Sequence, residues 1–154
     1  MRGVSLLHDH AAMGNSPAPA PAALDRRRAA RPLRILVADD DRDTVDMLSF
    51  ILRDEGHVVH GLYDGMEVLP AVRVWRPDAI ILDIAIPGMS GYALAQAIRN
   101  AFTTLRRPLL IAVSGQWKET PDRMVAQQVG FDHHLVKPYE PAVLLRLLEP
   151  LSAG

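Results

Sequence analysis

The 154-residue chain contains no cysteine, which excludes a disulfide framework and thiol chemistry and fits a reducing compartment. An excess of charge of one sign is also missing, because 17 Lys and Arg residues oppose 18 Asp and Glu residues. With a net charge of -1, the chain has no global basic field that would attract nucleic acid or anionic lipid. No apolar run approaches the about 18 residues of a membrane span. These absences favour a cytoplasmic protein without direct membrane or nucleic-acid partners.

Composition separates a short first segment from the rest of the chain. Overall, 49% of the residues are apolar and 23% are charged, as in ordinary globular domains. Residues 17–21 alternate proline with alanine, which favours extended polyproline II backbone, and residues 26–28 are consecutive arginines. We therefore predict a disordered Ala/Pro/Arg-rich tail over residues 1–32 and one folded domain over residues 33–150.

From Leu33 onward, short apolar runs alternate with amphipathic segments. The apolar runs consist of consecutive Ile, Leu and Val residues without a polar side, which indicates parallel strands buried on both faces. The predicted fold is therefore α/β, a doubly wound five-stranded parallel sheet in the common order 2-1-3-4-5 with helices on both faces. We predict strands over 33–38, 57–61, 78–83, 109–114 and 133–136, and helices over 41–55, 65–75, 91–101, 119–129 and 140–148.

Several helix ends can be predicted from single residues. Asp41 and Ser90 stand where a side-chain oxygen can cap the first turn of a helix. Gly56 and Gly130 follow the last apolar residues of two helices and are expected to end them. Pro70 lies inside a predicted helix, where it predicts a kink or a late helix start.

Acidic side chains end two of the predicted strands. Asp39, Asp40 and Asp41 follow the first strand directly, and Asp83 follows the third. In a sheet of this order, ligands bind at the carboxyl ends of strands one and three, where the winding reverses. Two carboxylates about 4 Å apart repel by about 4 kcal/mol at an effective dielectric constant of about 20. A cluster of this kind requires a cation or a raised carboxyl pKa.

The remaining strand ends carry Ser114 and Lys137. Oxygen-only ligands in a small crevice suit Mg²⁺, which is commonly shared between protein carboxylates and a phosphate. The ammonium group of Lys137 and the hydroxyl group of Ser114 would then hold phosphoryl oxygens. Each residue alone has an ordinary explanation as a cap, a turn or a solvated charge. Their joint placement at four strand ends predicts a site for a divalent ion and a phosphoryl group.

Four segments resemble the receiver domain of two-component response regulators. They are "ILVADDD", "IILDIAIPGMSGY", "IAVSG" and "HHLVKPYE", and they occur in the order and at the spacing of that family. The resemblance covers roughly Leu33 to Leu148 and implies the flavodoxin-like receiver fold. It implies that Asp83 is the phospho-acceptor. It also implies that Asp39, Asp40, Asp83 and the backbone carbonyl of Ala85 hold Mg²⁺.

The resemblance assigns further residues to the switch between two conformations. Ser114 matches the switch hydroxyl, and Lys137 matches the family's lysine, whose peptide bond to Pro138 is expected to be cis. The family's aromatic switch position, three residues before Lys137, holds His134 here. Ala85 and Gln116 occupy the two positions that flank the path of the hydrolysing water, where Ala85 offers no polar group.

These assignments predict a phospho-accepting signalling domain that catalyses only its own phosphorylation and dephosphorylation. Its partners would be a histidine kinase or histidine phosphotransfer protein and an output protein, with homodimerisation on phosphorylation as a further possibility. Alternatives are the receiver module of a hybrid histidine kinase, to which "GFDHHLVKP" is similar, and a receiver-like module that is never phosphorylated.

Two other protein classes fit less well. A haloacid dehalogenase-type phosphatase would need a later acidic pair, in place of which the chain has Lys137 and Pro138. A flavodoxin-type flavin binder would need a Ser/Thr/Gly phosphate loop after the first strand, where the three aspartates would repel a phosphate.

The histidine at the switch position gives a first prediction. An imidazole can rotate as the usual phenol does, although it is smaller and titratable near neutral pH. We expect His134 to be a tolerated replacement, so that kinase-driven activation of wild type and of His134→Tyr follows the same pH profile. Activation measured between pH 5.5 and 8 checks this, and diverging profiles would show that His134 makes the output pH-sensitive.

Overall fold

The computed structural model describes residues 31–102, 106–115 and 127–153. Its sheet has five strands in the order β2-β1-β3-β4-β5, and every neighbouring pair is parallel. The predicted doubly wound α/β fold is therefore confirmed. The strands are β1 (Arg34–Ala38), β2 (Val58–Leu62), β3 (Ala79–Asp83), β4 (Leu109–Ser114) and β5 (His133–Val136).

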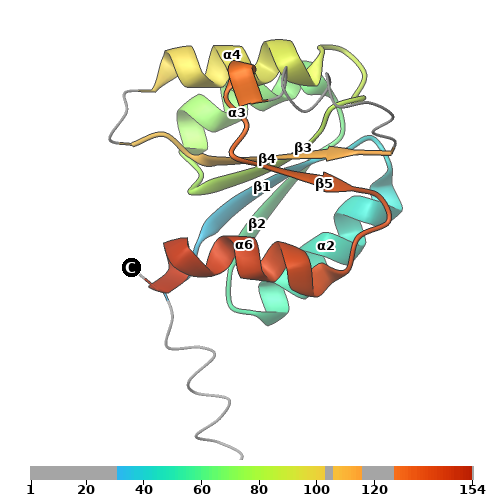
Figure 1. Ribbon diagram of the computed structural model, residues 1–154, viewed down its shortest axis with the longest axis vertical. Helices are drawn as coiled ribbons and strands as arrows, with labels where there is room; N and C mark the ends of the chain where they lie inside the picture. The colour runs from blue at the N-terminus through green and yellow to red at the C-terminus, as the bar shows by residue number, and fades with distance from the viewer. Residues whose placement is uncertain (1–30, 103–105, 116–126, 154) are drawn as a thin grey trace, which may run out of the picture.

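Helices cover both faces of the sheet, with α3 and α4 on one side and α2 and α6 on the other (Figure 1). Residues 127–129 are helical and belong to the predicted helix over 119–129, the rest of which lies outside the described residues. The predicted tail over residues 1–32 also lies outside them, apart from its last two residues. The described helices are α2 (Arg42–Asp54), the short 3-10 helix η1 (Gly65–Glu67), α3 (Val68–Trp75), α4 (Gly91–Ala101) and α6 (Pro141–Ala153).

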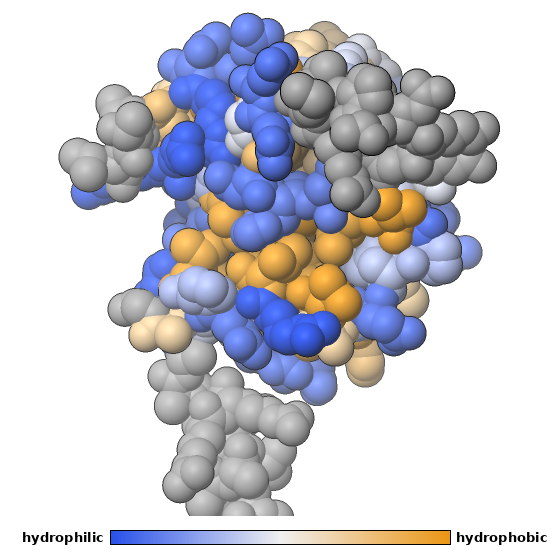
Figure 2. All heavy atoms as spheres, in the orientation of Figure 1, coloured by the Kyte–Doolittle hydropathy of each residue, from blue (hydrophilic) through white to orange (hydrophobic). Residues whose placement is uncertain are grey.

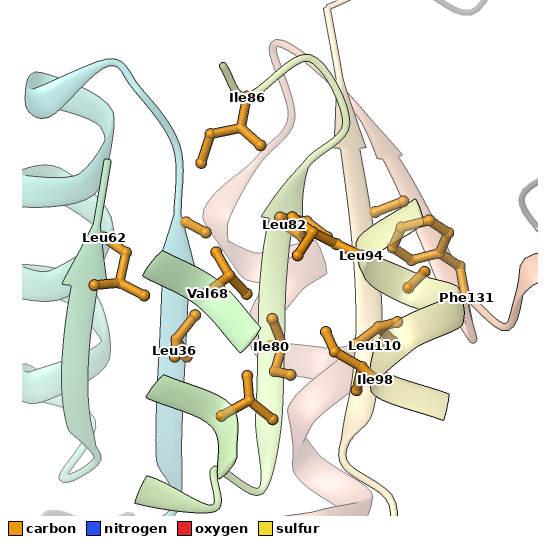
Figure 3. Packing of buried hydrophobic residues seen from close by; sticks show 14 residues of the cluster. Leu36, Leu62, Val68, Ile80, Leu82, Ile86, Leu94, Ile98, Leu110 and Phe131 are labelled. Carbon is orange, nitrogen blue, oxygen red and sulfur yellow. The ribbon is translucent and has the colours of Figure 1, made fainter. Parts of the chain in front are cut away.

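Alternate residues along each central strand face opposite sides of the sheet, which gives two separate cores. On the side of α3 and α4, Leu36, Ile80 and Leu110 are fully buried and pack together (Figure 3). On the side of α2 and α6, the neighbouring Ile35, Ile81 and Ile111 are buried to at least 98%. Because both faces are covered, the strands hold the residues at their carboxyl ends in fixed relative positions.

The predicted helix caps are present. Asp41 caps α2, since its Oδ1 accepts a hydrogen bond from the Asp43 N–H at 3.2 Å. Ser90 caps α4 in the same way, with its Oγ 3.2 Å from the Tyr92 nitrogen. Pro70 falls in the first turn of α3 because residues 65–67 form η1 instead of α-helix. The predicted late start of this helix is therefore confirmed.

The predicted C-terminal end of the last helix was wrong. We predicted that it stops at Leu148, but α6 continues to Ala153 with Pro150 inside it. Two hydrogen bonds hold the additional turn. The Arg31 N–H donates to the Ser152 carbonyl, and the Ser152 hydroxyl donates to the Arg31 carbonyl, both at 2.9 Å. This contact joins residues far apart in the sequence, so local patterns do not reveal it.

The buried cores predict where a substitution destabilises the fold. Leu36→Ala removes a fully buried side chain from the centre of the sheet and is expected to lower the free energy of unfolding by about 2–5 kcal/mol. Val74→Ala is the matched control, since Val74 is 87% exposed, and it should change stability by less than about 0.5 kcal/mol. Urea denaturation of both variants measures the difference, and equal stabilities would contradict this account of the core.

Candidate functional site

Three carboxylates meet at the carboxyl ends of β1 and β3. Asp39, Asp40 and Asp83 each offer an oxygen atom within 4.8 Å of the others. Asp39 is 4% exposed and Asp83 is 6% exposed, whereas Asp40 is open to solvent. The pairing of β1 with β3 produces this arrangement, because Ala38 lies beside Leu82 and the acids follow directly. The three acids predicted to meet are therefore close together.

Lys137 reaches the same acids from the end of β5. Its Nζ donates a hydrogen bond to Asp39 Oδ2 at 2.7 Å and lies 3.4 Å from Asp83 Oδ2. The Lys137 backbone N–H donates to the Ser114 carbonyl at 2.8 Å, which places Lys137 next to the end of β4. The Lys137–Pro138 peptide bond is cis, as the family resemblance implied. The ammonium group thus bridges the two buried carboxylates.

Burial and like charge raise the pKa of Asp83. The largest contribution is desolvation, and the negative charge of Asp39 acts in the same direction. The Ala85 N–H, 3.0 Å from Asp83 Oδ1, and the charge of Lys137 oppose the shift without cancelling it. Burial lowers the pKa of Lys137, but hydrogen bonds and charge from Asp39 and Asp83 outweigh burial, so that the pKa is raised.

Asp41, the third consecutive aspartate, has a different role. Its Oδ2 accepts a hydrogen bond from the Thr44 hydroxyl at 2.7 Å, and its Oδ1 caps α2 by accepting a hydrogen bond from the Asp43 N–H. The hydrogen bond from Thr44 contributes most to lowering the pKa of Asp41. Its carboxylate is therefore committed to the start of α2 and does not belong to the acidic cluster formed by Asp39, Asp40 and Asp83.

The acidic cluster fits a divalent cation by the chemistry of its donors. Three carboxylates face one ammonium group, so negative charge remains in excess. All donors are oxygen atoms, which suit Mg²⁺ better than a softer metal. Asp40 is exposed, which leaves one side of the cluster open to solvent. Such a cluster can hold a cation that keeps some of its water ligands.

Ala85 and Ser114 lie at the same edge of the sheet as the acids, whereas His134 lies within β5. Ala85 is exposed in the loop after β3, and Ser114 is half-buried at the end of β4. His134 is half-buried in β5, beside Ala112 of β4 in the sheet register. Gln116 lies outside the described residues.

Sequence reasoning missed two aromatic residues, Tyr63 and Tyr139. The guanidinium carbon of Arg42 lies 4.2 Å from the centroid of the Tyr63 ring, a cation–π contact between the start of α2 and the end of β2. Tyr139 follows the cis peptide bond by one residue, and burial raises its pKa to about 12. Neither the contact of Tyr63 nor the burial of Tyr139 has a signal in the spacing of the sequence, because both depend on how the elements pack.

Comparison with known proteins decides the family. Residues 35–149 match the family described as "Response regulator receiver domain". The chain belongs to this family. Receiver domains are signalling modules, and they generally bind Mg²⁺ at an acidic cluster of the kind formed here by Asp39, Asp40 and Asp83.

Curated relatives of this receiver domain include proteins of different lengths. The DNA-binding response regulator MtrA of Mycolicibacterium paratuberculosis is 36% identical over 112 residues, which cover 73% of this chain and 48% of MtrA. A 14.6 kDa protein of Leptolyngbya boryana is 36% identical over 115 residues, which cover 75% of this chain and 86% of that protein. The chain thus spans about half the length of MtrA and most of the smaller relative.

Solved structures agree with the fold of this receiver domain. The chemotaxis response regulator CheY4 of Vibrio cholerae has a TM-score of 0.69 and 27% identity, covering 78% of this chain and 98% of CheY4. A CheY-like receiver domain protein of Methanospirillum hungatei has a TM-score of 0.68 and 25% identity, covering 78% and 93% of the two chains. Among the helices in the described part of the chain, none has the length and hydropathy needed to traverse a bilayer.

The raised pKa of Asp83 predicts a pH dependence of stability without divalent ions. A carboxyl group whose pKa is higher in the folded than in the unfolded protein destabilises the fold when ionised, and this cost disappears as the pH falls through the folded pKa. In EDTA, Asp83→Asn should therefore be more stable than wild type at pH 7, and the difference should shrink towards pH 4. Thermal unfolding across this range checks the sign, with Asp46→Asn as a control at an exposed carboxylate. A less stable Asp83→Asn at pH 7 would contradict the direction of the shift.

Proposed function

We propose that this receiver domain accepts a phosphoryl group on Asp83 from a phosphohistidine of a histidine kinase or histidine phosphotransfer protein. The observation that supports this most strongly is the position of Asp83, which is buried among Asp39, Asp40 and Lys137 at one edge of a rigid sheet. In the cytoplasm, where we propose that the domain acts, phosphorylation would then change its affinity for an output protein.

The transfer requires one bond to form and one to break. An oxygen of the Asp83 carboxylate attacks the phosphorus atom, the phosphorus–nitrogen bond breaks, and its electron pair returns to the imidazole ring of the donor. The Ala85 N–H orients Asp83 Oδ1, and Lys137 Nζ lies beside Oδ2, where it can contact a phosphoryl oxygen. The product is an acyl phosphate on Asp83.

The acidic cluster would hold Mg²⁺ next to this carboxylate. The ligands would be the carboxylates of Asp39, Asp40 and Asp83 together with the backbone carbonyl of Ala85. When bound, Mg²⁺ would neutralise charge on the phosphoryl oxygens during transfer. Asp39 also positions Lys137, since the hydrogen bond between them is 2.7 Å long.

The readout that we propose is a shift between two conformations. A phosphoryl group on Asp83 adds charge and three acceptor oxygens, which the hydroxyl group of Ser114 and the ammonium group of Lys137 can bind. Ser114 ends β4 and Lys137 follows β5, so their movement would act on both strands and on His134.

Apolar side chains gather over α6 and the adjoining edge strand β5, which suggests a surface for the output partner (Figure 2). Val136 at the end of β5 is 38% exposed, and Val143 and Leu147 of α6 are partly exposed. Leu144 is buried and belongs to the core. An output protein or a second copy of the domain would cover this surface after phosphorylation, and direct nucleic-acid binding by the domain is not part of the proposal.

Phosphorylation by a small phosphodonor tests the proposal. Wild type incubated with Mg²⁺ and acetyl phosphate should gain the mass of one phosphoryl group, measured on the intact protein. Asp83→Asn should gain none, because an amide is not a nucleophile for phosphorus, and wild type in EDTA should gain none either. Modification of Asp83→Asn to the same extent as wild type would show that another residue is the acceptor.

A second experiment tests the position two residues after Asp83. The methyl group of Ala85 cannot orient a water molecule for attack on the acyl phosphate, whereas an amide can. We expect the phosphorylated Ala85→Asn variant to lose its phosphoryl group several-fold faster than wild type, measured by the loss of the added mass after the donor is removed. An unaltered rate would refute a role for this position in the lifetime of the phosphorylated state.

A further inference from the structure

The loop after β3 rests on a neighbouring turn that the proposed chemistry does not include. This loop, Ile84–Ser90, contains Ala85, whose carbonyl is proposed to complete the metal site. Against it lies the turn after β2, formed by Asp64 and Gly65, which we call the loop seat. The Gly65 N–H donates a hydrogen bond to the Pro87 carbonyl at 2.8 Å. This bond attaches the loop to a segment about 20 residues earlier in the chain.

The contact at Gly65 leaves no room for a side chain. A Cβ atom at this position would lie 2.9 Å from the Met89 carbonyl oxygen, 3.0 Å from the Met89 nitrogen and 3.1 Å from the Pro87 carbonyl oxygen. All three are backbone atoms, so no side-chain rotation can relieve the overlap. Gly65 does not have a positive φ, and glycine is therefore required here for its size alone.

Asp64 lies against the same loop at Gly88. Its Oδ1 accepts a hydrogen bond from the Met66 N–H at 2.7 Å, which fixes the carboxylate at the start of η1. A Cβ atom on Gly88 would lie only 2.2 Å from this oxygen, so the loop backbone passes directly over the carboxylate. Gly88 has a φ of 95°, a conformation that glycine adopts without strain.

Two further contacts outside the loop seat hold the loop. Ile86 is 4% exposed and packs into the core on the side of α3 and α4 (Figure 3). The Gly91 N–H donates to the Ile84 carbonyl at 3.2 Å. A Cβ atom on Gly91 would lie 2.6 Å from the Ile84 Cα. Between these points, the loop seat supplies the lateral contact that determines where the backbone at residues 87–89 lies.

We infer that Asp64 and Gly65 are positioning residues of the phosphorylation site. They hold the backbone at residues 87–89, which continues through Ile86 to Ala85. The direction of the Ala85 carbonyl, which we propose adds to the oxygen ligands of Asp39, Asp40 and Asp83, would then depend on this contact. This inference rests on the proposed function and adds to it a part of the site that comes from outside the acidic cluster. Groups that orient metal ligands commonly change metal affinity about 10–100-fold when they are altered.

The test is the affinity of the unphosphorylated domain for Mg²⁺, measured by titration calorimetry. Gly65→Ala should weaken Mg²⁺ binding about tenfold, because its methyl group overlaps the loop backbone at Pro87 and Met89 and forces it to shift. The Mg²⁺ concentration that gives half the maximal rate of phosphorylation by acetyl phosphate should rise by the same factor. At saturating Mg²⁺ the rate should remain within about twofold of wild type, since Asp83 and Lys137 are unchanged.

Gly61→Ala is the matched control. It adds the same methyl group in β2, but this group would meet the Val45 side chain of α2 at 2.5 Å instead of the loop backbone. It should lower the melting temperature and leave the Mg²⁺ affinity unchanged. Asp64→Ala, which removes the support under Gly88, should weaken Mg²⁺ binding, whereas Asp64→Asn, which keeps an acceptor oxygen, should restore most of the affinity. The two Asp64 variants decide the test if Gly65→Ala does not fold.

The outcomes separate this inference from the proposed function. If wild type binds Mg²⁺ and the folded Gly65→Ala and Asp64→Ala variants bind it equally well, the loop seat has only a structural role and the inference is overturned. The proposed function would be unaffected by that result. If wild type itself binds no Mg²⁺, both the proposed function and the inference fail.

Discussion

The structure of the site depends on the repulsion between carboxylates held at the end of a buried sheet. Asp39 and Asp83 are almost fully buried, and desolvation and mutual repulsion raise the pKa of Asp83. Lys137 offsets this cost by contacting both side chains, and the exposed Asp40 adds a third negative charge. Under the proposed function, the same excess of negative charge that destabilises the site would give it affinity for a divalent cation and, through that cation, for a phosphoryl group.

The parallel sheet keeps this unfavourable arrangement in place. The pairing of β1 with β3 and of β4 with β5 places Asp39, Asp83, Ser114 and Lys137 at one edge, and helices on both faces prevent the strands from sliding. Under the proposed function, the site would therefore respond to a phosphoryl group by local movement at the strand ends while the core remains intact. Its position at the carboxyl ends of the strands, where the winding reverses, is the usual ligand position of open α/β sheets.

The sequence contained most of the fold and most of the candidate site. Runs such as residues 79–82 revealed the strands because they have no polar side, and Asp83 was conspicuous because it ends such a run. The caps at Asp41 and Ser90 were also predictable from local chemistry. The last turn of α6 and the contact of the loop seat with the loop after β3 could not be predicted, since both depend on contacts between distant segments.

The central claim is that the acidic cluster, with a divalent cation, lets Asp83 take a phosphoryl group from histidine. Its most direct test is transfer from a radiolabelled phosphohistidine protein, either the autophosphorylated kinase or the phosphotransfer protein of the same organism, in Mg²⁺ and in EDTA. We expect label to move to this chain only in Mg²⁺ and to be released by mild alkali, as an acyl phosphate is. Label that remains on a competent donor in Mg²⁺, or that moves equally well in EDTA, would contradict the account.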